Sequence, residues 1–166
     1  YSKIEGFAFL PITSFMMALT TFVSQNRGAK EYERARKGAR FGLVCSVSLA
    51  ETIGLLIALF VTPLMRLFVD DLQVIQYGVE RAHYATILFF MLAYSHGVSA
   101  VLRGVGKSVV PMVVMLVCWC LVRVTLLTML NMLFHNILFI YLIYPFTWSL
   151  SSIVFFLYYR KINWQE

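Results

Sequence analysis

The chain has 166 residues, of which 60% are hydrophobic and only 13% are charged, and its net charge is +6. Soluble domains carry about 25% charged residues, so these few charges exclude a soluble globular domain, and the mean hydropathy of +0.78 indicates an integral membrane protein. The basic residues gather at the ends of apolar runs and not among aromatic side chains, which argues against a nucleic-acid partner.

Five apolar runs are long enough to cross a lipid bilayer, which takes about 20 residues of helix. In chain order they cover residues 6–23, 41–69, 83–101, 109–134 and 137–159. The links between them are short, so neighbouring helices are expected to be antiparallel. The sequence therefore predicts an all-α membrane protein with five transmembrane helices.

The distribution of basic residues predicts the orientation of these helices. Ten of them lie in the links at 24–40 and 102–108 and in the tail after residue 159. The opposite side carries only Lys3, Arg66 and Arg81. Because positive charge near a span resists translocation, we expect the N-terminus outside and the C-terminus in the cytoplasm. Asp71 and His135 are then expected in outer loops, and an odd number of spans that begins outside predicts a further helix upstream.

Two charged residues fall inside predicted spans, where a charge costs about 2.5–3.5 kcal/mol on insertion scales and faces protein or water. Glu51 lies about 15 Å from the cytoplasmic end of its span, where it either binds a cation or proton or forms hydrogen bonds within the bundle. Arg123 keeps its charge and needs a carboxylate, carbonyl groups or an anionic ligand. Glu51 is one candidate partner for it.

His96, Ser99 and Arg103 are spaced by three and four residues, so they share one face of a helix. They form a polar stripe on an otherwise apolar span. The histidine has two interpretations: it takes up a proton near neutral pH, or it is a hydrogen-bonded packing residue.

The sequence contains no motif for catalysis, metal binding or a cofactor. Gly-Val-Gly-Lys-Ser at 104–108 lacks the first glycine of a phosphate-binding loop and follows a helix where that loop follows a strand. The cysteines lie inside apolar runs at Cys45, Cys118 and Cys120. We therefore expect neither an enzyme nor a resident cofactor.

Several segments together resemble the multidrug and toxic compound extrusion (MATE) transporters. Phe-Val-Ser-Gln-Asn-x-Gly-Ala and Glu-Arg-Ala-x-x-Gly within 22–38 resemble one of their loops. Leu-Arg-Gly-x-Gly-Lys-Ser and Pro-Met within 102–112 resemble the turn between the tenth and eleventh helices. Tyr-Pro-Phe-Thr-Trp at 144–148 and Tyr-Tyr-Arg-Lys at 158–161 resemble the last helix and tail.

This resemblance implies a fold of twelve helices in two six-helix halves around a central cleft. The five spans would then be helices eight to twelve, most of one half, and the N-terminal half would be their partner. The family couples entry of Na⁺ or H⁺ to export of small organic compounds, often cationic, without nucleotide hydrolysis. We therefore expect an antiporter in the plasma membrane, with Glu51, His96 and Arg123 as candidates for the substrate or ion pathway.

Some residues depart from the family pattern, and three alternatives stay open. Some branches place an acidic cation ligand in the tenth helix, but 83–101 contains no Asp or Glu. Many members have proline two residues after an arginine in helix eleven, where this chain has Thr125. A lipid-linked oligosaccharide flippase of the same broad fold would favour a more basic cleft. A membrane-embedded enzyme would need convergent acid, base or metal groups, and a non-transporting scaffold would tolerate replacement of its intramembrane charges.

Overall fold

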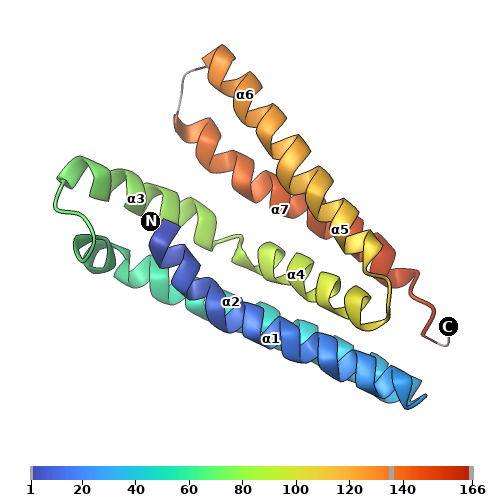
Figure 1. The fold of residues 1–166 in the computed structure, drawn as a ribbon. Helices are drawn as coiled ribbons and strands as arrows, with labels where there is room; N and C mark the ends of the chain where they lie inside the picture. The colour runs from blue at the N-terminus through green and yellow to red at the C-terminus, as the bar shows by residue number, and fades with distance from the viewer. Residues whose placement is uncertain (1, 135–136, 165–166) are drawn as a thin grey trace.

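The computed structural model describes residues 2–134 and 137–164. Its helices are, in chain order, α1 (Ser2–Gly28), α2 (Tyr32–Arg66), α3 (Leu72–Thr86), α4 (Phe89–Gly104), α5 (Val109–Met115), the π-helical segment η1 (Leu116–Val122), α6 (Arg123–Phe134) and α7 (Ile137–Arg160). The described residues contain no strand, and the long helices run back and forth beside one another (Figure 1). The predicted all-α fold is confirmed.

The helices have the length and composition of membrane spans. Helices α1, α2 and α7 and the continuous run α5–η1–α6 each qualify, and the bent pair α3–α4 brings the number of candidate spans to five. Large apolar side chains face outward, with Met17, Phe41 and Met132 all more than 70% exposed, as suits contact with lipid. His135, expected in an outer loop, lies outside the described residues.

The third span differs from its prediction. A continuous helix over 83–101 was expected, but α3 begins at Leu72 and the helix bends by 57° at the break between α3 and α4. Asp71 is not a simple loop residue, because its side chain caps α3 by accepting hydrogen bonds from two backbone N–H groups. The charges near Asp71 suggested that the stretch before residue 83 is an outer link. Small and apolar residues recur there at helical spacing, however, and those such as Gly78 and Ala82 are buried, so the helix begins earlier than expected.

Helices α1, α2 and α4 form a closely packed layer. A Cβ atom at Gly42 of α2 would overlap the side chain of Leu19 on α1. A Cβ atom at Gly104 of α4 would lie 2.8 Å from the Val23 Cβ and 2.9 Å from the Thr20 carbonyl oxygen. Such small residues allow membrane helices to approach closely, so these glycines explain the tight contacts of α1 with α2 and α4.

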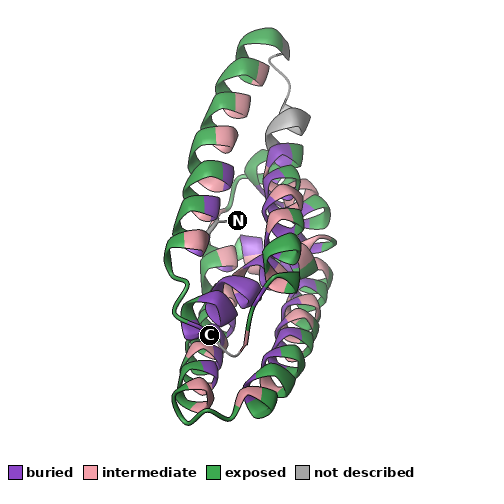
Figure 2. Cartoon of the chain, turned by 90° about the vertical axis from the view of Figure 1, so that its right-hand side faces the viewer, coloured by how far each residue is buried: buried purple, intermediate pink, exposed green. Residues whose placement is uncertain are grey.

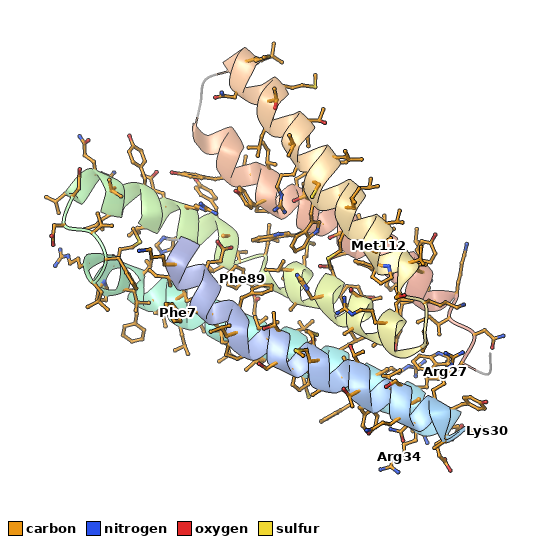
Figure 3. All side chains as sticks on the ribbon, in the orientation of Figure 1. Phe7, Arg27, Lys30, Arg34, Phe89 and Met112 are labelled. Atoms are coloured by element: carbon orange, nitrogen blue, oxygen red, sulfur yellow. The ribbon has the colours of Figure 1, made fainter. Side chains whose placement is uncertain are left out.

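The second layer consists of α7, which packs on α4, and the run α5–η1–α6, which packs beside α7. The run α5–η1–α6 is the least buried part of the bundle, as its largely green surface in Figure 2 indicates. The links rich in basic residues lie at one end of the molecule, where Figure 3 labels Arg27, Lys30 and Arg34. The ends of α4, α5 and α7 meet at the same end (Figure 1).

Candidate functional site

Arg123 begins α6 directly after the π-helical segment, and its side chain packs against η1 and α7. Its Nε and Nη2 atoms donate hydrogen bonds to the Thr147 hydroxyl at 3.2 and 2.7 Å. Its guanidinium also lies over two aromatic rings, 5.1 Å from the centroid of Trp119 and 4.7 Å from that of Tyr144. Arginine over an aromatic face is a favourable contact, so a hydroxyl and two rings compensate for the partly buried charge.

Among the described residues, the structure does not pair Arg123 with Glu51, the acidic partner suggested by the sequence. The carboxylate whose charge acts on Arg123 is Glu5 of α1. Glu5 forms an ion pair with Arg81 of α3 at 3.5 Å, and both side chains are only 20–25% exposed.

Tyr144 of α7 connects the two arginines. The Arg81 guanidinium lies 4.9 Å from the Tyr144 ring centroid, and that of Arg123 lies 4.7 Å from it. One ring therefore contacts two cations that come from different helices. Arg81 also pairs with the Glu5 carboxylate. The Tyr144 ring therefore contacts both cations, and the carboxylate contacts Arg81.

His96 of α4 joins this group through its neighbours. Its ring makes edge contacts with Phe9 of α1 and Trp119 of η1, both at 5.1 Å between centroids. Its Nε2 atom is buried and has no hydrogen-bond partner within the described part of the chain. The structure thus brings two of the predicted residues, His96 and Arg123, into contact with the same Trp119 ring.

We call this group the Arg123 cluster. It is a continuous series of contacts that joins α1, α3, α4, η1, α6 and α7, and its members are Glu5, Phe9, Arg81, His96, Trp119, Arg123, Tyr144 and Thr147. π-Helical segments often occur at functional sites, and here η1 carries Trp119 at the centre of the cluster. The polar stripe predicted on α4 is also present, since the Arg103 Nη1 atom donates to the Ser99 hydroxyl at 2.9 Å.

Sequence reasoning missed Glu5 and Arg81. The first span was expected to begin at residue 6, and Arg81 was assigned to the outer side. A signal existed for Glu5, because the buried positions of α1 continue at helical spacing from Met16 and Ile12 back to Ile4. A helix drawn to include Ile4 would have contained Glu5.

Glu51 lies apart, at the break between α3 and α4. It lines an open pocket of about 360 Å³ together with Thr52, Thr86, Ile87 and neighbouring apolar residues. Its carboxylate lies against the backbone N–H of Phe90, one of the unpaired donors in the first turn of α4. The Oε2 atom is buried, and none of the described residues forms a hydrogen bond with it. Glu51 therefore stabilises the broken helix and presents a free acceptor beside it.

Comparison with known proteins identifies the family. A family model named MatE matches residues 1–129. The chain belongs to the MatE family of multidrug and toxic compound extrusion (MATE) proteins. It is also 30% identical over 112 residues to the probable multidrug resistance protein NorM of Thermotoga maritima. That alignment covers 68% of this chain and 24% of the relative, so the chain spans about a quarter of that protein.

The matched part of this MATE protein contains most of the candidate residues. Glu5, Glu51, Arg81, His96 and Arg123 all fall within residues 1–129. Helix α7, which supplies the ring and the hydroxyl that hold Arg123, begins after the matched region. The family resemblance read from the sequence and its assignment to a multi-pass membrane protein are confirmed.

Proposed function

We propose that the chain is the C-terminal portion of a plasma-membrane antiporter that exports small organic cations in exchange for Na⁺ or H⁺ by alternating access. Membership of the MATE family and the multidrug resistance name of the NorM relative support the proposal. A second, N-terminal bundle would supply the other wall of the cleft. The end of the bundle with ten basic residues would face the cytoplasm.

The observation that carries this proposal is the Glu5–Arg81 ion pair within the Arg123 cluster. Glu5 is the only carboxylate among the described members of the cluster. A coupling ion needs a negative group inside the membrane that can be neutralised and released again. Binding of H⁺ or Na⁺ to Glu5 would remove the charge that holds Arg81.

The geometry gives Arg81 a second partner when the ion pair breaks. Its guanidinium already contacts the Tyr144 ring, so release from Glu5 would not leave it without a favourable contact. Arg81 lies on α3, which is joined to α4 by the 57° bend. Neutralising Glu5 would therefore free α3 to tilt about the break, while α4 stays packed against α1 and α2.

The other candidates have separate roles in this proposal. Glu51 offers a free carboxylate oxygen at the break, so it is the second candidate for the coupling ion. Unwound backbone beside such breaks coordinates ions in many carriers. His96 and Arg123 both contact Trp119, and this aromatic group would contribute a cation–ring contact to an organic cation in the cleft.

Ion-driven efflux of a fluorescent organic cation from proteoliposomes that contain the full-length transporter tests the assignment. We expect Glu5→Gln to abolish efflux driven by an imposed Na⁺ or H⁺ gradient, because Gln keeps the size and hydrogen bonding of Glu but cannot be charged. Glu33→Gln is the matched control, since Glu33 is exposed and pairs only with Lys37 near the helix end. Wild-type efflux by Glu5→Gln would reject Glu5 as the coupling group. The same assay on Glu51→Gln asks whether coupling depends on the helix break.

The 166-residue chain alone should not transport, because a cleft between two bundles needs both. Reconstitution of this chain without its partner bundle is expected to give no saturable, ion-dependent efflux. Such efflux would disprove the two-bundle mechanism. Restoring transport by adding the N-terminal bundle as a separate chain would support it.

Cysteine labelling in intact cells tests the orientation. In a cysteine-free background, Asp70→Cys is expected to react with an impermeant reagent, and Arg34→Cys is expected to react only after the cells are opened. Asp70 is preferable to Asp71, because Asp71 caps α3. Labelling of position 34 but not of position 70 in intact cells would reverse the orientation.

A flippase for lipid-linked oligosaccharides is the second candidate, and one observation favours it. The cluster holds two guanidinium groups, from Arg81 and Arg123, but only one carboxylate. A surplus positive charge suits the phosphate of a lipid-linked sugar. Translocation of a fluorescent phosphate-linked lipid, without efflux of organic cations, would favour this function over the antiporter.

A further inference from the structure

A second polar site lies far from the Arg123 cluster, at the basic end of the bundle. It is an open pocket of about 330 Å³ between the first turns of α2 and the tail that follows α7. Its lining residues are Tyr32, Glu33, Arg36, Lys37, Arg40 and Trp164. The mechanism proposed above uses none of them.

The pocket carries unbalanced positive charge. Arg36 and Arg40 are four residues apart, so they lie on one face of α2, and neither forms an ion pair with a described carboxylate. The acidic residue of the pocket, Glu33, lies 3.5 Å from Lys37 and balances that charge. Two guanidinium groups therefore face the pocket without a negative partner among residues 2–134 and 137–164.

A buried hydroxyl lies beside the pocket and interacts with its arginines. The Tyr159 hydroxyl of α7 is buried, and Arg40 acts on it through its charge and as a hydrogen-bond donor, while Arg36 acts on it through its charge. The Tyr159 ring packs edge to face against the ring of Trp164, at 6.4 Å between centroids. Two guanidinium groups and a hydroxyl thus converge where the described residues supply no unpaired carboxylate, and an oxygen atom of an anion would satisfy them.

The position of the pocket indicates which anion it takes. It lies where membrane-spanning helices α2 and α7 end, at the level of lipid headgroups. Tyr32 and Trp164 flank it, and both residue types are enriched at this level of the bilayer. Basic pockets at the ends of transmembrane helices bind anionic lipid headgroups. We propose that Arg36, Arg40 and the Tyr159 hydroxyl bind the phosphate of an anionic phospholipid.

The test compares two double variants of the full-length transporter. Arg36→Gln with Arg40→Gln removes two cations from the pocket, whereas Lys30→Gln with Arg34→Gln removes two exposed cations of the same link that do not line it. Binding of phosphatidylglycerol and of phosphatidylcholine is measured by native mass spectrometry in detergent micelles. Each basic residue near an anionic headgroup contributes about 1 kcal/mol, so we expect the pocket variant to lose about thirtyfold in affinity for phosphatidylglycerol.

The control variant should keep most of the wild-type affinity, and all three proteins should bind phosphatidylcholine equally weakly. Equal losses in both double variants would overturn the proposal, because they would mean that the charge of the whole link attracts the lipid. Tyr159→Phe, which removes only the hydroxyl, should weaken phosphatidylglycerol binding by a smaller factor. An unchanged affinity would remove Tyr159 from the site.

A competition experiment distinguishes a lipid from a soluble phosphate. Inorganic phosphate or glycerol phosphate should fail to displace phosphatidylglycerol at concentrations that leave the protein folded, because neither supplies acyl chains that contact the spans. Displacement by inorganic phosphate alone would overturn the lipid assignment in favour of a soluble anion. None of these results depends on coupled efflux, so the lipid site and the transport function can fail separately.

Discussion

The contacts within the first layer of the bundle differ from the contacts that join the second layer to it. Helices α1, α2 and α4 meet through small residues and apolar side chains, and even the Thr20 hydroxyl contributes by donating to the Ala100 carbonyl oxygen at 3.1 Å. The second layer also buries apolar side chains against the first, such as Phe155 and Trp148 of α7, but polar groups lie among them. The Ser152 hydroxyl of α7 donates to the Met91 carbonyl oxygen of α4 at 2.7 Å. Within the second layer, the Trp119 Nε1 atom donates to the Ser151 hydroxyl at 3.2 Å.

This difference matters for motion. Close apolar packing has one good arrangement, because any shift opens voids or creates overlaps. Hydrogen bonds, ion pairs and cation–ring contacts can exchange one partner for another at lower cost, as Arg81 can between Glu5 and Tyr144. We therefore expect α1, α2 and α4 to move as one body and the contacts with α3, α6 and α7 to rearrange.

The largest expected effect is overpacking of the first layer. Gly104→Ala would place a Cβ atom 2.9 Å from the Thr20 carbonyl oxygen and 2.8 Å from the Val23 Cβ. Neither atom is at the end of a flexible side chain, so the helices must separate. We expect the free energy of unfolding to fall by about 1–3 kcal/mol, measured by thermal unfolding in detergent.

Gly6→Ala is the matched control for this variant. No atom lies within 4 Å of a Cβ at Gly6, and alanine is the better helix former by up to about 1 kcal/mol. The control should be as stable as the wild type or slightly more stable. A loss of stability in Gly6→Ala that equals the loss in Gly104→Ala would contradict the packing difference between the two positions.

Most of the fold could be predicted from the sequence, because hydropathy alone determines where a helix can cross a membrane. The break between α3 and α4 could not. The break falls at Ile87 and Leu88, and neither residue is a proline or a glycine, so no local sequence signal indicates the break. Glu51, on another helix, lies against the backbone N–H of Phe90 in the first turn of α4. That is a tertiary effect, and sequence spacing does not contain it.

The prediction of the candidate site was incomplete for a similar reason. His96 and Arg123 were found because a polar residue inside an apolar run needs an explanation. Glu5 and Arg81 lie near the ends of apolar runs, where charge is ordinary. Only the three-dimensional arrangement shows that the 57° bend brings α3 to a position where Arg81 reaches Glu5.

The next effect in size is the energetic coupling between Glu5 and Arg81. A double-mutant cycle with Glu5→Gln and Arg81→Gln is expected to give a coupling free energy of about 1–2 kcal/mol, because both side chains are largely shielded from water. The same cycle on Glu33 and Lys37, which are 90% and 79% exposed, should give about 0.3–0.5 kcal/mol. Equal coupling in the two cycles would mean that the interior pair is screened as fully as the surface pair.

The smallest expected effect concerns the Tyr144 ring. Tyr144→Phe keeps the aromatic face that contacts Arg81 and Arg123, so its stability should stay within about 0.5 kcal/mol of the wild type. Tyr144→Leu removes the face and should cost about 1 kcal/mol more than Phe. Tyr158→Leu on the exposed side of the same helix is the control and should change little. If Leu and Phe at position 144 were equally stable, the ring would only fill space, and its contacts with Arg81 and Arg123 would add nothing to the stability.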